Sequence, residues 1–439
     1  MRNRIKEKIC SLESREFKVD SIINFIILLT IMLMPYIVYK YTYSPYIDGK
    51  AFFLYGVGIL LFILALLSKQ DLFMIFTEKI IIIAFGVSLI FSTIFAINPG
   101  LALMGNKNRN EGLLMFLVYI LLFIMAAKYI NLTNKRIDIL LLVSCLMAIY
   151  SIVEFYQIDP LQVYLIGSLS YDQAMSFLGN RNFLSSYIIL FIGAATLLYI
   201  FKGKIKYLIV SSILFASLLC TLTRGGWVGF VVMLLFTAII MFKNRELRKR
   251  FLAILLSFCM IFMILDFTTD NSISSRFSSM TSDAGRLLNG DTSDLGTSRS
   301  EIWKMVIKSI EMHPIMGGGL DSLQLRLMRD VPKDNEVLIA KNNQIIDKAH
   351  NEFLELWASG GFFAFFFYVI LLVVIYKNII RNIKKPKYKA MFICLTGYLV
   401  QSLFNISVIG VAPLYWIFLG AIVKSYRSRD DKNTNNIRV

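Results

Sequence analysis

Long apolar segments separated by short polar ones recur along most of the chain. A membrane-spanning helix needs roughly 20 mostly apolar residues, and about twelve segments qualify as candidates. They lie near 21–39, 51–68, 80–97, 112–130, 138–156, 182–201, 207–223, 225–242, 251–267, 353–376, 390–406 and 411–423. The pattern therefore predicts an all-α integral membrane protein with about 12 transmembrane helices.

One polar segment, residues 268–350, is much longer than the other connections. A connection of this length is usually functional or disordered, and this one contains signals for ordered helices. Ser298 followed by Glu301 is a capping-box pattern that predicts the start of a helix, and Pro314 and the glycines at 317–319 predict its end. The glycines favour a turn between helices, because the Lys and Ser or Thr of a phosphate-binding loop are missing. The apolar face of the predicted helix consists of Ile302, Trp303, Val306, Ile307 and Ile310.

A second amphipathic helix is predicted in the same loop from the spacing of Leu320, Leu323, Leu327 and Val331. Residues 268–297 are rich in Ser, Thr, Asp and Gly, and we expect them to be irregular. Helices of this kind are suited to lie on the membrane surface or to cover a cavity between the spans. The predicted layout is a basic tail (1–20), helices 1–9 (21–267), the loop (268–350), helices 10–12 (351–425) and a polar tail (426–439).

The composition excludes most soluble enzymes and any largely disordered protein. Hydrophobic residues make up 57% of the chain and charged residues 17%, and the mean hydropathy is +0.65. A soluble globular chain has about 45–50% apolar and about 25% charged residues. The solvent of this chain is therefore mostly lipid.

The formal net charge of +17 is explained by where the cations lie. Most Lys and Arg fall in the terminal segments and in the connections on the same side of the membrane as the termini. Such segments stay in the cytoplasm, so we expect a multi-pass protein of the cytoplasmic membrane with both termini inside and the 268–350 loop outside. The cations then face anionic lipid, and no nucleic-acid partner is needed. No cleaved signal is expected, because the first apolar segment is of full length.

Both histidines of the chain fall on the predicted outer side. His350 lies where the long loop re-enters the membrane, and a neutral imidazole there can accept a proton near neutral pH. A helix-start residue bonded to water is an equally good interpretation. His313 precedes Pro314 at a helix end, where contact with the helix dipole is the favoured role. Two histidines, no CxxC pair and no carboxylate pair at metal spacing lead us to expect neither a metal nor a cofactor.

Arginines on the predicted outer side are the most informative charges. Arg109, Arg181 and Arg224 lie in outer connections with few other cations, and Arg299 begins the loop helix. Outer positive charge is disfavoured by topology, and a guanidinium group binds phosphate through two parallel hydrogen bonds. The functional interpretation is therefore a negatively charged substrate, with a lipid diphosphate as the natural candidate. The alternative is contact with lipid headgroups or ion pairing with Glu111, Glu154 or Asp172.

Several strings between residues about 80 and 425 together resemble the O-antigen ligase and O-antigen polymerase family of bacterial membrane proteins. They are an outer-loop Gly…Arg…Gly segment, a Gly-Asn-x-Asn-Phe motif, a Ser/Thr-Arg-Gly turn, an Arg-x-x-x-Trp helix followed by Pro and glycines, and a His-Asn motif. In this chain they are GNKNRNEG (105–112), FLGNRNFLSSY (177–187), TRGGW (223–227), RSEIWKMVIKSIEMHPIMGGG (299–319) and HNEFLELWASGG (350–361). Arg181 departs from the family, because Pro is common at its position.

The resemblance implies a GT-C-like membrane glycosyltransferase that is metal-independent and inverting and uses a polyprenyl-diphosphate glycan donor. The acceptor is a lipid or a growing glycan, so the protein is either a ligase or a polymerase. In the implied site His350 orients or deprotonates the acceptor, and Arg224 and Arg299 stabilise charge on the leaving diphosphate. The other expected substrate contacts are Arg109, Arg181, Asn180, Asn182, Asn351 and Glu352.

A secondary transporter and a lipid flippase are the competing interpretations. Twelve spans with both ends inside suit a transporter. However, transporters place ionisable residues near the membrane midplane and usually have repeated halves. The predicted spans hold few charges, and Glu154, Asp266 and Glu355 lie near their outer ends. Glycosyl transfer is therefore favoured, whereas the acceptor, the sugar and the choice between ligase and polymerase are not written in these motifs.

Overall fold

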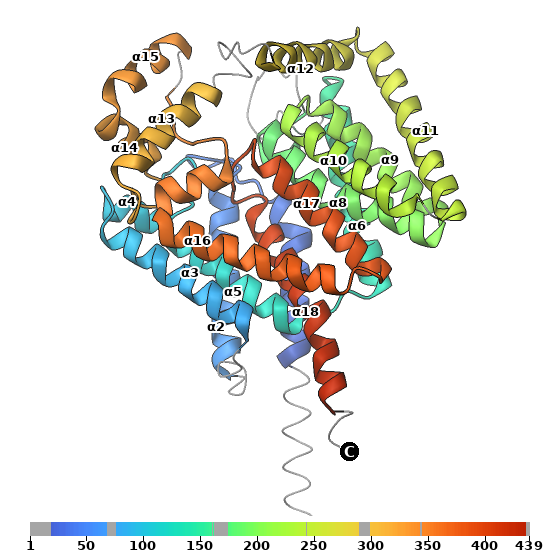
Figure 1. Ribbon diagram of the computed structural model, residues 1–439, viewed down its shortest axis with the longest axis horizontal. Helices are drawn as coiled ribbons and strands as arrows, with labels where there is room; N and C mark the ends of the chain where they lie inside the picture. Colours follow the sequence, from blue (N-terminus) through green and yellow to red (C-terminus); the bar gives the residue numbers. More distant parts are fainter. Residues whose placement is uncertain are drawn as a thin grey trace, which may run out of the picture.

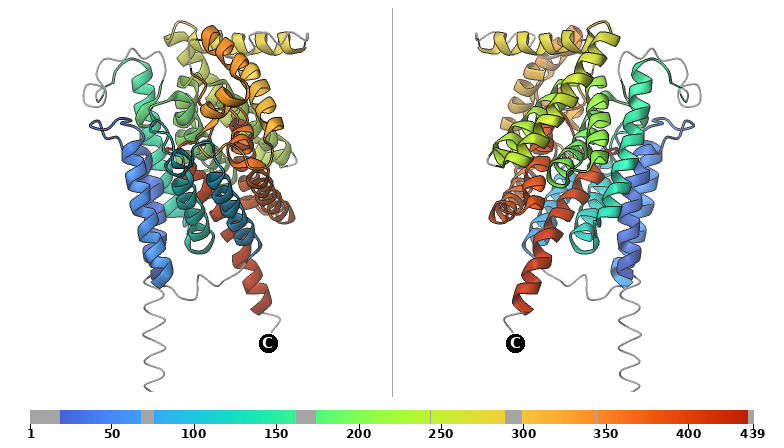
Figure 2. Two further views of the ribbon diagram at one scale, coloured as in Figure 1. Left: turned by 90° about the vertical axis from the view of Figure 1, so that its left-hand side faces the viewer. Right: turned by 90° about the vertical axis from the view of Figure 1, so that its right-hand side faces the viewer.

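The computed structural model describes residues 19–67, 76–159, 161, 174–242, 244–288, 299–342 and 345–435, and every regular element in these ranges is a helix. Four helices gather at one end of the bundle, namely α12 (Ser272–Leu288), α13 (Arg299–Met312), α14 (Leu323–Asp330) and α15 (Pro332–Asn342). The described N- and C-terminal ends of the chain lie together at the opposite end (Figures 1 and 2).

Each predicted apolar segment falls on a helix. In chain order these are Val19–Tyr36, whose last turn is the 3₁₀ helix η1 (Met34–Tyr36), α2 (Asp48–Leu67), α3 (Thr77–Ile94), α5 (Leu113–Tyr129), α6 (Asn134–Phe155), α8 (Arg181–Lys202), α9 (Ile205–Cys220), α10 (Arg224–Met241), α11 (Arg245–Thr268), α16 (Glu352–Arg381), α17 (Pro386–Ser402) and α18 (Ala412–Asn435). Among the described residues, 8 helices are long and apolar enough to cross a membrane, and α5 and α9 are shorter apolar helices. The chain is thus a multi-pass membrane protein, and the count of twelve spans stays a prediction.

The first predicted loop helix is confirmed as α13. Its predicted cap, Ser298, lies outside the described residues. The helix buries Ile302, Val306 and Ile310 as expected, but Ile307 is 44% exposed and Met305 is buried in its place. The second helix is shorter than predicted: α14 covers Leu323–Asp330, so Leu320 and Val331 flank it, and the unpredicted α15 follows directly.

The prediction that residues 268–297 are irregular is wrong for α12. The spacing of Ile273, Phe277 and Met280 is that of a helix face, and Ile273 is completely buried. The first turn of α12 is fixed to the end of α11, because the Ser274 N–H donates to Asp266 Oδ1 at 2.8 Å. The serine-rich composition lowers intrinsic helix propensity, and packing against the bundle overrides it. Residues 289–298 lie outside the described part.

Small residues let the spans approach closely. A Cβ atom on Gly229 of α10 would lie 2.7 Å from the Gly397 carbonyl oxygen of α17, and one on Gly420 of α18 would lie 2.6 Å from the Phe123 carbonyl oxygen of α5. Glycines at such crossings allow backbone contact between membrane helices. The first contact packs α10 directly against α17, and the second packs α18 against α5.

The start of α16 is held by the turn that follows α13. Helix α16 consists of two segments joined at Gly361, where φ is 80° and ψ is 178°. At this kink the N–H groups of Gly318 and Gly319 donate to the carbonyls of Ala358 and Ser359, at 2.9 and 3.0 Å. The glycines at 317–319 therefore form a turn between helices, as expected, and they dock the outer loop onto the helix that follows His350.

Arg326 of α14 ties the outer helices together. Its guanidinium is completely buried and donates to Ser309 Oγ at 2.7 Å, to the His313 carbonyl at 3.0 Å and to the Ala358 carbonyl. Asp330 balances its charge at 3.3 Å. One side chain thus joins α13, α14 and α16.

Candidate active site

Arg181 begins α8, and the residues before it explain why the helix starts there. The 3₁₀ helix η2 (Ser176–Leu178) ends at Gly179, whose φ is 69° and whose Cβ would lie 2.4 Å from the Tyr46 ring. Asn180 then caps α8, because its Oδ1 accepts the Asn182 N–H at 2.8 Å. The Gly-Asn-x-Asn-Phe segment is therefore a turn that places an arginine at the positive end of a helix.

Arg224 begins α10 close to α8. A Cβ atom on Gly226 would lie 1.8 Å from Ser185 Oγ of α8, and one on Gly225 would lie 2.8 Å from Phe404 Cβ. Only glycine allows this approach. The short Thr-Arg-Gly turn thus brings together the starts of α8 and α10, and with them the arginines that begin both helices.

Helix α12 adds a third arginine. Arg276 Nε donates to the Leu222 carbonyl at 3.1 Å, and Ser279 Oγ accepts from Arg224 Nη2 at 2.8 Å. These two bonds hold α12 across the turn that precedes α10. Sequence analysis missed Arg276 because its segment was expected to be irregular.

Arg299 at the start of α13 completes this group, which we name the arginine cluster (Arg181, Arg224, Arg276 and Arg299). Burial lowers the pKa of Arg299, and the three other arginines lower it further, to about 10. The group is still cationic at neutral pH. In the part of the chain that the structure describes, neither Arg181 nor Arg299 has a carboxylate partner. Three members also begin helices, whose positive ends add to the same field.

His350 sits in a backbone turn that its neighbours hold from both sides. Its φ is 50°, a left-handed value that is uncommon for residues other than glycine. The Ala349 carbonyl accepts from Trp303 Nε1 and the Ala349 N–H donates to Glu355 Oε2, both at 2.9 Å. Asn351 follows as the cap of α16. The turn is therefore fixed by residues from α13 and α16.

The imidazole of His350 has an unpartnered nitrogen, whereas both backbone groups of the preceding Ala349 are hydrogen-bonded. Its Nδ1 atom is buried and has no hydrogen-bond partner among the described residues. Burial lowers the pKa of His350, and Arg299 and Arg109 lower it further against the opposing effect of Asp347, to about 4. His350 is therefore a neutral base at neutral pH. Arg299 is the strongest charge that acts on it, so His350 borders the arginine cluster.

Arg109 approaches His350 from another side. Gly105 and Gly112 close its loop, because a Cβ on Gly112 would lie 2.3 Å from the Gly105 nitrogen. From this loop Arg109 donates through Nε and Nη2 to one oxygen of Asp347, at 3.0 and 2.7 Å. Arg109 thus lowers the pKa of His350. It is not among the charges that shift the pKa of Arg299, which are the other three arginines of the cluster.

The ion pairs that were considered as alternatives for the arginines do not form in the described residues. Glu111 Oε1 accepts from the hydroxyls of Tyr119 at 3.1 Å and Ser407 at 3.4 Å. Glu154 Oε2 accepts backbone N–H groups of Met175 and Ser176, at 2.8 and 2.6 Å. Asp172 lies outside the described residues. The acid that pairs with Arg109 is Asp347.

The remaining predicted substrate contacts lie at helix starts. Asn180 caps α8, and Asn351 caps α16 by accepting two backbone N–H groups at 3.0 and 3.1 Å. The Asn182 carbonyl accepts from Asn405 Nδ2 at 2.9 Å. Glu352 begins α16, and its buried Oε2 has no partner among the described residues. The amides therefore shape the helix starts that carry Arg181 and His350.

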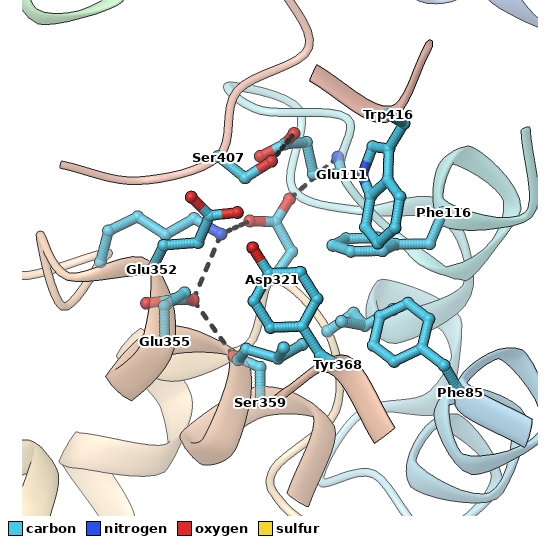
Figure 3. Close-up of a pocket in the computed structure, with 13 residues that line it drawn as sticks. Phe85, Glu111, Phe116, Asp321, Glu352, Glu355, Ser359, Tyr368, Ser407 and Trp416 are labelled. Atoms are coloured by element: carbon cyan, nitrogen blue, oxygen red, sulfur yellow. Dashed lines mark hydrogen bonds and ion pairs between the residues drawn. The ribbon is translucent and has the colours of Figure 1, made fainter. Parts of the chain in front are cut away.

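Beside His350 lies a small cavity with aromatic side chains, among them Phe85, Phe116, Tyr368 and Trp416, in its wall (Figure 3). We name its charged part the carboxylate pocket (Glu111, Asp321, Lys348, Glu352 and Glu355). The volume of the cavity is about 40 Å³, enough for a few water molecules and too small for a sugar. Lys348 Nζ lies 2.7 Å from Asp321 Oδ1 and 3.3 Å from Glu355 Oε1. Sequence analysis missed this pocket, because its members come from three distant segments.

The surroundings in the pocket shift the pKa values of Lys348 and Glu111. Burial lowers the pKa of Lys348, but Asp321, Glu355 and Glu111 outweigh burial and raise that pKa well above its usual value. Burial raises the pKa of Glu111 to about 7, with Lys348 opposing and Asp321 adding to the shift. Lys348 is thus a permanent buried cation, and Glu111 is a carboxyl group that keeps its proton up to neutral pH.

His313 lies away from this site. Its N–H donates to the Ser309 and Ile310 carbonyls at the end of α13, and Nε2 lies 3.6 Å from Asp330 Oδ1. Its position at a helix end is as predicted. Among the described residues, no group of three His, Cys, Asp or Glu side chains is placed to hold a metal ion.

Comparison with known proteins adds one match. The model of the O-antigen ligase family matches residues 209–369, a range that contains Arg224, Arg299 and His350 but not Arg109 or Arg181. No curated protein matches the chain. The matched range includes three of the five motifs noted in the sequence, together with the outer loop and the start of α16. This match supports the assignment of the chain to the O-antigen ligase and polymerase family.

Proposed function

We propose that the protein is a glycosyltransferase that moves a glycan from a polyprenyl-diphosphate carrier to an acceptor at the outer face of the cytoplasmic membrane. The observation that supports this most is the arginine cluster beside a neutral histidine. Four guanidinium groups and three helix starts concentrate positive charge at one end of a membrane bundle. A lipid diphosphate supplies matching negative charge on a tail that lies in the bilayer.

In the proposed reaction the acceptor hydroxyl oxygen attacks the anomeric carbon of the donor sugar. The new C–O bond forms as the bond from that carbon to the diphosphate oxygen breaks, and the diphosphate leaves with the electron pair. The hydroxyl proton passes to the imidazole of His350, whose Nδ1 has no hydrogen-bond partner among the described residues. Direct displacement inverts the configuration of the sugar.

Arg224 and Arg299 stabilise the charge that grows on the leaving diphosphate. Arg181 holds the donor beside them. Asp347 occupies Nε and Nη2 of Arg109, which leaves Nη1 for the donor. Because arginines carry this charge, the proposed reaction needs no metal ion.

Donor binding also tunes the base. Arg299 is the strongest charge that lowers the pKa of His350, and a bound diphosphate neutralises Arg299. The pKa of His350 therefore rises from about 4 toward the working pH when the donor is in place. A bound donor thus makes His350 a stronger base, although burial, the largest cause of its low pKa, remains.

A product assay tests the proposal. Purified protein in lipid nanodiscs receives a polyprenyl-diphosphate oligosaccharide from the host, with or without membrane extract as a source of acceptor, and with a chelator throughout. A ladder of longer lipid-linked glycans identifies a polymerase, and one product that requires extract identifies a ligase. If no glycan is transferred in either case, the proposal fails and transport becomes the leading explanation.

The proposed orientation has its own test. In a variant without native cysteines, a cysteine at Lys333 of α15 should react with an impermeant thiol reagent in intact cells, and one at Lys385 before α17 should not. Both lysines are exposed, so accessibility does not decide the result. The reverse pattern would place the arginine cluster on the cytoplasmic side.

A further inference from the structure

We propose that Lys348, Asp321 and Glu355 form a positioning unit that sets the His350 turn relative to the Arg109 loop. The inference rests on the proposed function, because it assigns a purpose to the distance between a base and a donor-binding loop. None of the three residues needs to touch a substrate. Their pocket has room only for water (Figure 3).

The unit holds the His350 turn through contacts at two residues. Lys348 precedes His350 by two residues, and its ammonium group is nearly completely buried between Asp321 and Glu355. Glu355 reaches back from the first turn of α16, so that its Oε2 accepts the Ala349 N–H at 2.9 Å. Its other oxygen accepts from Ser359 Oγ at 3.1 Å. The turn is thus fixed on both sides of Ala349.

The same unit is hydrogen-bonded to the Arg109 loop through Asp321. Asp321 Oδ2 accepts the Asn106 N–H at 2.7 Å and the Glu111 N–H at 3.3 Å. These two residues lie on either side of Arg109 in its closed loop. Asp321 Oδ1 meanwhile contacts Lys348 at 2.7 Å. One carboxylate therefore links the backbone of the Arg109 loop to the residue just before the histidine turn.

A second link joins the same two segments. Asp347 pairs with Arg109 at 2.7 Å, one residue away from Lys348. Two adjacent residues of the 347–355 segment are thus tied to the 105–112 loop, one directly and one through Asp321. Two links at neighbouring residues define an orientation as well as a distance, so they hold the backbone of the His350 turn at a set position relative to the Arg109 loop.

Apolar side chains in place of these charged ones would not fix the orientation of the His350 turn relative to the Arg109 loop. Buried charges are costly and contribute little net stability, but their hydrogen bonds are directional and select one geometry. His350 has a left-handed backbone, which such a network can hold. The other charged groups that face Lys348 are Glu111 and Glu352 in the same pocket. The charged side chains of the pocket therefore serve to fix the backbone geometry of the His350 turn.

The test uses Lys348→Met, Asp321→Asn and the double variant, with Lys308→Met as a control. Lys308 is an exposed loop lysine that pairs with Asp334, so the control makes the same chemical change at an ion pair outside the site. Thermal stability, donor KM and kcat are measured in nanodiscs. Lys348→Met leaves the Asp321 and Glu355 carboxylates without their cation, and Asp321→Asn leaves Lys348 paired with Glu355 alone. The double variant removes the Lys348–Asp321 pair and leaves one carboxylate, Glu355, without its cation.

The expected result separates geometry from charge balance. Lys348→Met should lower kcat at least about tenfold, with donor KM within about twofold, because the arginine cluster still binds the donor. The double variant should regain part of the thermal stability that Lys348→Met loses, because Asp321 no longer carries an unpaired charge, while its kcat stays low. Lys308→Met should match the wild type in all three quantities.

Three results would overturn the inference: wild-type kcat in Lys348→Met, a double variant that regains kcat together with stability, or KM rising in step with the loss of kcat. If Lys348→Met does not fold, the double variant decides alone. Absence of glycan transfer by the wild type would instead contradict the proposed function, so the two failures are distinguishable.

Discussion

The arginine cluster and the carboxylate pocket both border His350, but they treat charge in opposite ways. In the cluster, four cations raise one another's energy, and two of them have no carboxylate partner among the described residues. In the pocket, Lys348 is matched by carboxylates at 2.7 and 3.3 Å whose oxygens also accept backbone N–H groups. The cluster is therefore a group of like charges, whereas in the pocket the buried cation is paired with carboxylates.

This difference distinguishes a binding region from a supporting one. An unbalanced group of like charges is stabilised by a ligand of opposite charge, whereas a balanced network is stabilised only by its own geometry. Substitutions in the two regions should therefore have different signatures. Changes in the cluster should affect ligand binding and turnover with little cost in stability, and changes in the supporting contacts should affect stability or geometry.

The largest effect is expected at His350, where the two regions meet. His350→Ala removes the proposed base and should lower kcat by about 10²–10⁴, the range typical of general-base loss. Expression and thermal stability should stay near wild type, because the Nδ1 atom makes no hydrogen bond in the described residues. Turnover close to wild type in the product assay would remove His350 from the mechanism.

Arg299→Gln should have the next largest effect. It removes one charge-stabilising donor and should lower kcat by about 10²–10³. Thermal stability without donor should be unchanged or higher, because the repulsion among four arginines is relieved. A large loss of stability together with wild-type kcat per folded molecule would mean that the arginine is structural.

Arg326→Met should show the opposite signature. This arginine is completely buried, and its loss removes one cation from beside Asp330 and the hydrogen bonds that it donates to the carbonyls of Ser309, His313 and Ala358. We expect a cost of about 3–5 kcal/mol in the free energy of unfolding. Arg329→Met is the matched control, since Arg329 is exposed and pairs with the same Asp330, and it should cost less than about 1 kcal/mol. Equal effects in denaturant unfolding would refute the assignment.

The pH profile sharpens the link between the cluster and the base. In the free enzyme His350 has a pKa of about 4, so the acid limb of kcat/KM should lie near that value and not near 6.5. Bound diphosphate neutralises Arg299, so the acid limb of kcat should lie at higher pH than that of kcat/KM. Acid limbs at the same pH for kcat and kcat/KM would show that the charge of the bound donor does not change the pKa of His350.

The smallest effect concerns Glu111. Its pKa is raised in the folded protein to about 7, so the folded state binds the proton more tightly than the unfolded state. Its contribution to stability is full below the unfolded pKa and is lost as pH rises through the folded pKa. From pH 5 to 8 the Tm of the wild type should therefore fall more than that of Glu111→Gln. Parallel curves would contradict the raised pKa.

The apolar pattern predicted the helices well because each segment must satisfy its backbone within the bilayer. The arginines at helix starts were also recognised, since Arg181, Arg224 and Arg299 each follow turn or cap signals in the sequence. The turn at Gly317 was predicted from the same kind of local signal. These features depend on residues close together in the chain.

Features that depend on distant contacts were not predictable. Helix α12 forms because Ile273 is buried against the bundle, which its serine-rich sequence does not indicate. Nothing local in the sequence distinguishes Lys348, and only the fold brings Asp321 and Glu355 next to it. Asp347 was not considered as the partner of Arg109, because 238 residues separate the two in sequence. A single sequence does not record such pairings.

Binding of a sugar-free polyprenyl diphosphate tests the central claim most directly. The lipid is added to the nanodisc-embedded wild type, Arg299→Gln and Lys348→Met, and the shift in Tm is followed against a polyprenyl monophosphate. The account predicts that the diphosphate raises the Tm of wild type and Lys348→Met more than the monophosphate does, and that Arg299→Gln loses most of this shift. Equal shifts for both lipids, or an undiminished shift in Arg299→Gln, would contradict the assignment of the arginine cluster to a lipid diphosphate.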